Sequence, residues 1–442
     1  MTIRLSDHFT YRRLLRFALP SILMMVFTSI YGVVDGYFIS NYVGKVPFAA
    51  VNFIMPFLML LGALGFMIGA GGSALIGKYL GEGRAQDAKR LFSFLIYLTL
   101  AAGVFVAAVG ELTLRPVARA LGADDLMLPG CVRYGRIILI GLPALMLQFA
   151  FQSFYVTAEI PQMGLYVTLS AGGMNMLLDW LLVGVFHLDI EGAALATIIS
   201  QFVGGYVPLI YFLCPNCSLL RIGKSRFDGR ALAKVLGNGA SEFVSNISLS
   251  VVTMLYNAQL MKFAGENGVA AYGALMYVCF IFISVFVGYA VGTAPIISFH
   301  FGAKNPAELK SLLQKSLRMI SCFALLMLFA GELLAKPLSR LYVGYDQELM
   351  QMTIRGFRIT SISFFFAAFP IFGSSFFTAL NDGKSSAIIS FLRQFVFQVG
   401  SVLLLPLALG LDGIWFSNVL AESAATLLTI CFWIGKRKQF QY

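Results

Sequence analysis

The chain has 442 residues, of which 59% are hydrophobic and only 12% are charged. A soluble domain carries roughly 25% charged residues and a disordered chain is more polar still, so this composition excludes both classes. The net charge is +11, but the basic residues stand in short gaps between apolar runs, which favours a role in membrane topology over nucleic-acid binding. Because one span needs about 20 apolar residues, the length suits a single polytopic membrane body of about 12 to 14 helices.

The first apolar run, from Phe17 to Val43, follows four arginines and superficially resembles a signal peptide. It is too long for a cleavable apolar segment and lacks a small-residue cleavage site, which indicates a first membrane helix. In chain order the apolar runs predict an all-α polytopic membrane protein with twelve transmembrane helices. The predicted spans lie at 14–40, 47–71, 90–110, 130–155, 163–186, 191–213, 235–261, 268–293, 312–331, 351–378, 385–408 and 413–434.

The distribution of basic residues predicts how these spans are oriented. If the N-terminus is cytoplasmic, the inside segments carry 21 lysines and arginines and the outside segments carry ten. Such a bias places the richer side in the cytoplasm. We therefore expect a protein of the inner (plasma) membrane with both termini in the cytoplasm.

The sequence repeats itself at half its length. Sliding it by 221 residues aligns Gly81 with Gly302 and Lys89 with Lys310, without a gap, together with other turn residues along the whole chain. Six spans per copy insert both copies in the same direction, so the copies should form two six-helix lobes related by a pseudo-two-fold axis along the membrane normal. The predicted parts are an N-terminal lobe at 1–213, a cytoplasmic interlobe linker at 214–234 and a C-terminal lobe at 235–442.

Six cysteines are present, most of them single residues within apolar runs, where thiols pack as small hydrophobes. Cys214 and Cys217 form a lone C-x-x-C in the linker, with no second pair to complete a zinc site. We expect no cofactor, and the role of these two cysteines stays open.

A set of motifs resembles the multidrug and toxic compound extrusion (MATE) transporters, in particular their prokaryotic branches, over essentially the whole chain. These motifs are Asp35 after Pro20 in the first span, the glycine–lysine loops Gly81 to Lys89 and Gly302 to Lys310, the Asn175 to Asp179 segment, and Glu191-Gly192-Ala193-Ala194. The resemblance implies a transporter, not an enzyme. It would export organic, often cationic, compounds by a rocker-switch driven by H⁺ or Na⁺.

The residues themselves point to an ion site in the first lobe. An ionised Asp at mid-span costs at least about 2.5–3.5 kcal/mol on insertion scales, so it normally faces the interior and has a function or a partner. Asp35 lies about 28 Å along a helix from Arg16, and Asp179 lies about 26 Å from Gln162, which puts both at a similar depth. Three further polar residues are expected at the same level, namely Asn175, Thr197 and Tyr134.

Two carboxylates close together in a low dielectric cannot both ionise cheaply, so one should hold a proton near neutral pH. The oxygens of Asp35, Asn175, Asp179 and Thr197 also suit a dehydrated Na⁺, and the sequence does not separate the two ions. The alternative is that the acids are hydrogen-bonded structural residues without a transport role.

Pro20 removes one helical hydrogen bond and frees the carbonyl of Arg16, which makes it a candidate hinge in the first span. We hypothesise that protonation of Asp35 is coupled to bending at this point. A static kink is the alternative.

The second lobe lacks the acids of the first, because Asp35 aligns with Tyr256 and Asp179 aligns with Gly400. Its own candidate is Glu242, for which the alternatives are substrate binding or ion coupling on the one hand and a structural hydrogen bond on the other. Arg393 is a candidate counter-ion for Glu242.

Gln148 and Gln152 bring polar atoms into the fourth span and are expected to line the substrate cavity. Glu159 is expected to be a solvated charge in the turn after that span. Gly65, Gly69, Gly71 and Gly72 are expected to be helix-packing residues.

Two other functions compete with drug export. A lipid-linked saccharide flippase of the same superfamily usually places basic side chains in its cavity, whereas this chain buries acids. An intramembrane enzyme is disfavoured because the chain has no H-E-x-x-H and no G-x-S-x-G motif. The expected partners are a small organic, often cationic, substrate and the lipid bilayer, with no nucleic acid, and the chain is expected to act as a monomer.

Overall fold

The computed structural model of the protein describes residues 3–442 apart from 44, 122, 124, 126, 217 and 345. Cys217, and with it half of the C-x-x-C motif, therefore lies outside the described residues. No strand occurs in the described part of the chain, which consists of helices and short connections. The α-helices are α1 (Tyr11–Phe38), α2 (Lys45–Gly81), α3 (Ala85–Leu121), α4 (Leu128–Thr157), α5 (Pro161–Leu178), α6 (Asp189–Leu213), α7 (Gly229–Gly302), α8 (Pro306–Val343), α9 (Gln347–Ala379), α10 (Gly383–Phe391), α11 (Gln398–Leu409) and α12 (Leu411–Phe440).

Within the same residues, three π-helical turns interrupt or extend these helices. They are η1 (Ile39–Val43) after α1, η2 (Asp179–Val185) after α5 and η3 (Leu392–Phe397) between α10 and α11. The α10, η3 and α11 segments follow one another directly and form one continuous apolar stretch of 27 residues, which is the predicted eleventh span.

Helix α7 contains two of the predicted spans. Its 74 residues would reach about 110 Å if straight, far more than one membrane crossing requires. Gly265 breaks the helical backbone with φ 61° and ψ −150°, a conformation that only glycine adopts readily, and so separates the seventh span from the eighth. Over the described ranges the fold thus has twelve membrane-spanning segments in two lobes, as the sequence predicts.

Several helices are longer than their apolar runs. Helix α2 continues to Gly81 although its apolar run ends at residue 71, and α3 begins at Ala85, five residues before its run. The added residues of α3 are largely polar, whereas those of α2 include the buried Leu75 and Ile76; in both, the helical backbone satisfies its own hydrogen bonds. The predicted apolar runs therefore underestimate the length of these helices.

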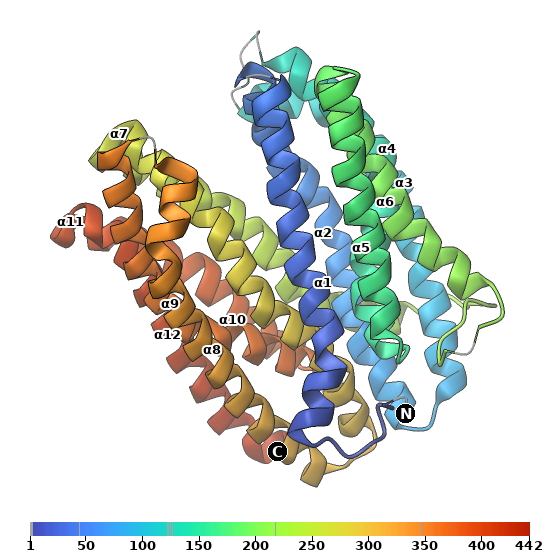
Figure 1. Cartoon of the computed structure of the whole chain (residues 1–442). Helices are drawn as coiled ribbons and strands as arrows, with labels where there is room; N and C mark the ends of the chain where they lie inside the picture. Colours follow the sequence, from blue (N-terminus) through green and yellow to red (C-terminus); the bar gives the residue numbers. More distant parts are fainter. Residues whose placement is uncertain are drawn as a thin grey trace.

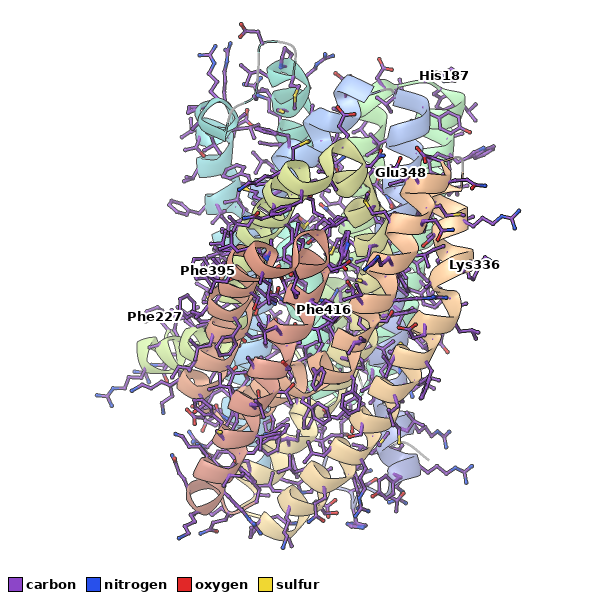
Figure 2. All side chains as sticks on the ribbon, turned by 90° about the vertical axis from the view of Figure 1, so that its left-hand side faces the viewer. His187, Phe227, Lys336, Glu348, Phe395 and Phe416 are labelled. Atoms are coloured by element: carbon purple, nitrogen blue, oxygen red, sulfur yellow. The ribbon has the colours of Figure 1, made fainter. Side chains whose placement is uncertain are left out.

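The two lobes diverge toward one end of the molecule, and both chain termini lie at the opposite end (Figure 1). Figure 2 places His187, which precedes α6, and Glu348, in the first turn of α9, toward the end that carries neither terminus. His187 lies in the connection after the fifth span and Glu348 lies directly after the connection that follows the ninth, so the alternation of spans agrees with this placement.

The lobes meet where α2 and α7 approach closely at glycines. A Cβ atom on Gly81 would overlap the carbonyl of Phe299, and one on Gly302 would overlap the carbonyl of Lys78. A shift of 221 residues converts the first contact into the second. This seam is therefore self-complementary, as two-fold packing of a repeat requires.

The predicted helix-packing glycines of the second span also lie at close helix contacts, where there is no room for a side chain. Cβ atoms on Gly65 and Gly69 would overlap the backbone of α4, and one on Gly71 would overlap the backbone of α7. Small residues allow this close approach between membrane helices.

The N-terminal arm, residues 3–10, crosses from one lobe to the other. The Leu5 amide donates to Glu159 Oε1 (2.5 Å), and the Phe9 amide donates to Glu308 Oε1 (3.0 Å) in the first turn of α8. His8 Nδ1 lies 2.6 Å from the other oxygen of Glu308. The prediction that Glu159 is merely a solvated charge is wrong, because its half-buried carboxylate holds the arm.

The linker follows α6 as an extended segment and packs on the first lobe. Leu220 is buried, the Ile222 amide donates to the Phe212 carbonyl (2.9 Å), and the Gly223 amide donates to Ser93 Oγ (3.0 Å) on α3. The last six residues assigned to the linker from the sequence, 229–234, are already the beginning of α7.

Candidate functional site

Asp35 and Asp179 lie next to each other inside the first lobe. Asp35 is on α1, Asp179 is the first residue of η2, and the two side chains are close enough to interact directly. Asp179 is 0% exposed. One oxygen of Asp35 and both oxygens of Asp179 are buried without a hydrogen-bond partner among the described residues. Because ionised carboxylates can only accept, this pair needs a proton or another cation between its oxygens.

Three further predicted residues lie near the pair, on α5, α4 and α6. Asn175, one turn before Asp179 on α5, is buried, and its side-chain oxygen and nitrogen have no partner in the described part of the chain. Tyr134 on α4 is fully buried and interacts electrostatically with both carboxylates. Thr197 on α6 lies beside Tyr134 and donates its hydroxyl to the carbonyl of Ala193 (3.0 Å).

The structure adds two residues that the sequence prediction missed. Tyr31, one turn before Asp35, interacts electrostatically with Asp35 and lies within hydrogen-bonding reach of the Gln148 side chain. Gln201, one turn after Thr197, is buried, and its Oε1 has no partner among the described residues. A search for polar residues four positions from each candidate would have found both, because such residues share a helix face.

Gln148 and Gln152 are buried on α4, one turn apart. The Oε1 atom of each lacks a hydrogen-bond partner within the described ranges. Gln148 packs against Gly204 of α6, where a Cβ atom would overlap its side chain. The interior of the first lobe therefore holds a column of unsatisfied acceptors that continues from the carboxylate pair along α4.

Each of the three π-helical turns lies beside a charged residue inside the membrane. Asp35 is four residues before η1, Asp179 opens η2, and η3 contains Arg393. A π-turn shifts the register of the side chains that follow it, and such turns occur frequently at functional sites. The sequence pattern carries no signal for them.

Pro20 lies within α1, which is continuous from Tyr11 to Phe38. Proline has no amide hydrogen, so the Arg16 carbonyl receives no bond from residue 20. The structure thus contains the weak point that the hinge hypothesis requires, in an unbroken helix.

The second lobe corrects the predicted pairing of Arg393. Its guanidinium forms a two-pronged ion pair with Glu422 of α12, with Nε–Oε2 at 2.8 Å and Nη2–Oε1 at 2.9 Å. Glu242 interacts with Arg393 only electrostatically. Glu422 is a buried acid within the predicted twelfth span, so the rule that flagged Asp35 would also have flagged it.

The residue that replaces Asp35 in the second lobe belongs to a closed hydrogen-bond network. Tyr256 donates to Gln398 Oε1 (2.9 Å), Gln398 donates to Asn418 Oδ1 (2.7 Å), and Asn418 donates to Ser363 Oγ (2.9 Å). These buried polar groups satisfy one another. The buried polar groups around Asp35 and Asp179 in the first lobe have no such network among the described residues, and this contrast distinguishes two lobes of similar architecture.

Comparisons with known proteins agree with this architecture. The family model MatE matches residues 20–181 and 243–403. The multidrug export protein MepA of Staphylococcus aureus (strain MSSA476) is 23% identical over 419 residues, covering 94% of this chain and 92% of that protein. MepA of Staphylococcus haemolyticus is 24% identical over 425 residues, covering 95% and 92%.

Solved structures share the fold over nearly the whole length. A crystal structure of a MATE protein in complex with MaL6 has a TM-score of 0.93 at 20% identity, with 98% of each chain covered. An outward-facing MATE family transporter of the MOP superfamily also has a TM-score of 0.93 at 20% identity, covering 98% of this chain and 97% of the other. A MOP superfamily transporter from Pyrococcus furiosus has a TM-score of 0.91 at 20% identity, with 98% of both chains covered.

Proposed function

Because the chain belongs to the multidrug and toxic compound extrusion (MATE) family, which consists of transporters and not enzymes, we propose that it is a cation-coupled antiporter. It exports organic, often cationic, compounds in exchange for H⁺ or Na⁺. The MepA relatives are named as multidrug export proteins, which supports this substrate class. The proposed setting is the plasma membrane, with both termini in the cytoplasm and the chain acting as a monomer.

The contrast between the lobes carries this proposal. The first lobe buries carboxylate and amide oxygens without partners among the described residues, whereas the network of Tyr256 in the second lobe is closed. A buried acceptor without a partner costs free energy that a bound cation recovers. A coupling ion is therefore expected between Asp35 and Asp179, where H⁺ needs one carboxylate and Na⁺ also draws on Asn175 and Thr197.

Ion binding and substrate binding are coupled because the ion and a cationic substrate compete for the negative charge of the carboxylate pair. With the ion bound, the carboxylate pair is neutralised, and without it the first lobe attracts a cationic substrate. Bending of α1 at Pro20 would link this charge change to the shape of the cavity, because the helix is weakened in the turn that precedes that proline. The rocking of one lobe against the other then exposes the cavity to either side.

Glu242, Gln148 and Gln152 are the proposed substrate-binding groups. Arg393 is neutralised by Glu422, so it leaves the half-buried Glu242 carboxylate free for an organic cation. The flippase alternative requires a free basic group for a pyrophosphate, and the ion pair removes the Arg393 charge from that role.

Reconstitution in proteoliposomes tests the proposal. A proton or a sodium gradient is imposed separately, and efflux of a fluorescent organic cation is measured for the wild type, Asp35→Asn and Asp179→Asn. One gradient should drive efflux by the wild type, and each substitution should reduce it at least about tenfold, because removal of either carboxylate removes ion binding. Asp189→Asn is the matched control, since Asp189 is an exposed acid on α6 and should be dispensable.

Efflux that survives in Asp35→Asn would contradict the assignment of the ion site. Transport of a lipid-linked saccharide without transport of any organic cation would replace the function by that of a flippase.

A further inference from the structure

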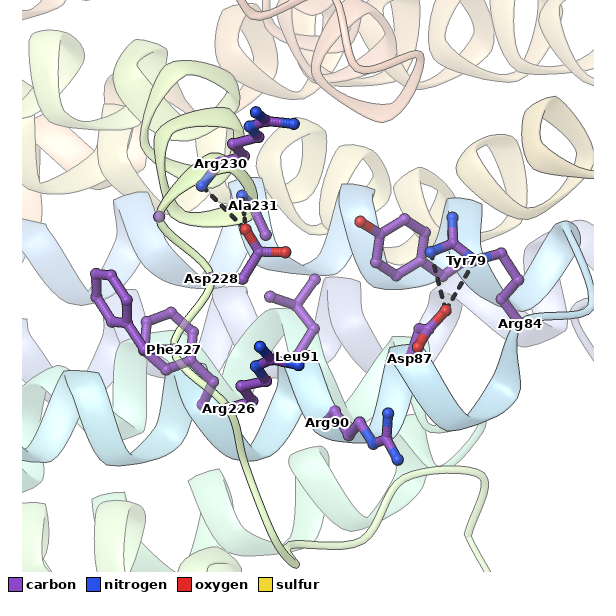
Figure 3. A pocket seen from close by; sticks show the side chains of 12 residues that line it. Tyr79, Arg84, Asp87, Arg90, Leu91, Arg226, Phe227, Asp228, Arg230 and Ala231 are labelled. Carbon is purple, nitrogen blue, oxygen red and sulfur yellow. Dashed lines mark hydrogen bonds and ion pairs between the residues drawn. The ribbon is translucent and has the colours of Figure 1, made fainter.

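A basic cavity lies on the surface where the first lobe, the linker and α7 meet (Figure 3). Its volume is about 590 Å³. Tyr79 of α2, Arg90 of α3, and Arg226 and Arg230 at the junction of the linker and α7 all line it. None of the residues that line it is among the groups proposed for transport.

The charges in the cavity are unbalanced. Arg84 is engaged by Asp87 (Nη2–Oδ2 2.8 Å) and by Glu82 (3.1 Å). Asp228 is engaged too, because its Oδ1 accepts from the amides of Arg230 (3.0 Å) and Ala231 (3.1 Å) and so caps α7.

Three arginine side chains remain without such partners. The guanidinium groups of Arg90, Arg226 and Arg230 make no hydrogen bond or ion pair with the part of the chain that the structure describes. In Figure 3 the dashed lines reach Arg84 and the backbone of Arg230, but not these three side-chain ends. The cavity therefore presents three guanidinium groups without a counter-ion contact, and they outnumber the one carboxylate, Asp228, that is not paired with an arginine.

An aromatic pair adjoins these charges. Phe227 is 73% exposed and packs edge-on against Phe94 of α3, with ring centroids 5.7 Å apart. Figure 2 shows Phe227 at the outer edge of the molecule. An exposed apolar ring beside arginines at the ends of membrane helices suits the interface between lipid and water, where the ring can contact acyl chains and the arginines can contact headgroups.

The position of the cavity also points to lipid. It lies where α2 ends, where α3 begins and where α7 begins, and each of these helices spans the membrane. Basic pockets at such helix ends bind the phosphates of lipid headgroups. A free phosphate has the same charge, but it would make no use of an exposed phenylalanine beside the arginines.

We propose that this cavity binds the headgroup of an anionic phospholipid, with the phosphate on Arg90, Arg226 and Arg230 and the glycerol and chains against Phe94 and Phe227. Membrane topology alone requires basic residues on one side, but not a cavity in which three of them adjoin an aromatic pair. The bound lipid connects α3 of the first lobe to the start of α7.

Native mass spectrometry of the detergent-purified full-length protein tests this directly. Retention of phosphatidylglycerol is compared with retention of phosphatidylcholine for the wild type and for the double variant Arg226→Gln/Arg230→Gln. The wild type should retain phosphatidylglycerol preferentially, and the double variant should lose about tenfold in retention, because each arginine near an anionic headgroup contributes to its attraction.

The matched control is Arg221→Gln/Lys224→Gln, which removes two exposed charges from the same linker but not from the cavity. It should retain the lipid like the wild type, and Arg226→Lys should retain most of it, which separates loss of charge from misfolding. Equal loss in the control, equal retention of phosphatidylcholine, or displacement of the lipid by inorganic phosphate at a similar concentration would overturn the proposal. Lipid retention is measured without transport, so the lipid-binding proposal can fail while the proposed function holds, and the reverse.

Discussion

Arg393 and Glu422 show how a single buried pair sets the charge of the second lobe. Their two short hydrogen bonds neutralise a guanidinium that would otherwise repel the cationic substrate proposed to bind at Glu242. In the first lobe, polar atoms of Asp35, Asn175 and Asp179 are buried without a hydrogen-bond partner among the described residues. At the scale of single residues, the two lobes therefore differ in whether their buried charges are compensated from within.

Glu422→Gln is expected to lower the unfolding temperature of the purified protein. The substitution leaves a largely buried arginine without its counter-ion, which costs about 3 kcal/mol. The double variant Arg393→Gln/Glu422→Gln should regain most of the loss, since it leaves no uncompensated charge. An unchanged unfolding temperature for Glu422→Gln would show that Arg393 is satisfied elsewhere.

Spacing along the sequence was sufficient to predict which residues of the first lobe share a level. The positions of Asp35 and Asp179 relative to the ends of their helices placed them together, and the structure brings them into direct interaction. The partner of Arg393 was not predictable in this way, because π-turn η3 changes the direction in which that side chain leaves its helix. Local spacing gives depth, whereas pairing depends on rotation about the helix axis.

At the scale of elements, the N-terminal arm is tied to both lobes by carboxylates. Glu159 in the turn between α4 and α5 binds one end of it, and Glu308 of α8 binds the other. Burial raises the pKa of Glu159, and the hydrogen bond from the Leu5 amide and the charge of Arg4 partly oppose this. The nearby Asp7 raises the pKa further.

This shift predicts a pH dependence with a definite sign. Because the pKa of folded Glu159 is raised, its contribution to stability is present below the unfolded value of about 4.3 and is lost as pH rises through the folded value. Thermal unfolding of the wild type and Glu159→Gln should therefore differ in slope as pH rises above about 4.3, the wild type losing stability relative to the variant. Parallel curves would contradict a buried, titrating Glu159.

The sequence predicted where the apolar spans lie, but not where the helices begin and end. The sequence separated the seventh and eighth spans, and the structure joins them into α7 with a break at Gly265. Which glycine carries the positive φ could not be predicted from composition, because several glycines occur near predicted breaks. The extended arm and the linker likewise lack periodicity, and tertiary contacts decide their paths.

The stability of the whole molecule is expected to depend on how closely α2 and α7 approach at the seam between the lobes. Gly81→Ala and Gly302→Ala should each lower the unfolding temperature, because a methyl group there meets a main-chain carbonyl of the facing helix. Overpacking of this kind costs about 1–3 kcal/mol. The two effects should be similar, since the repeat relates the two contacts.

Gly237→Ala is the matched control for these variants. Gly237 lies on α7, and nothing stands within 4 Å of the point that a Cβ atom would occupy there, so the substitution should be neutral or slightly stabilising through helix propensity. Equal unfolding temperatures for Gly81→Ala, Gly302→Ala and Gly237→Ala would contradict the claim that close packing at the seam stabilises the protein.

The proposed exchange transport requires that the carboxylate pair of the first lobe holds the ion that leaves when substrate binds. Linkage demands that a substrate which competes with this ion releases it on binding. Ion release can be followed as a pH change in weakly buffered solution, or as displacement of radioactive sodium, when an organic cation is added to the purified protein. The wild type and Asp189→Asn should release the ion when substrate binds, and Asp35→Asn/Asp179→Asn should release none while remaining folded. Undiminished release by that double variant would contradict an ion site at Asp35 and Asp179.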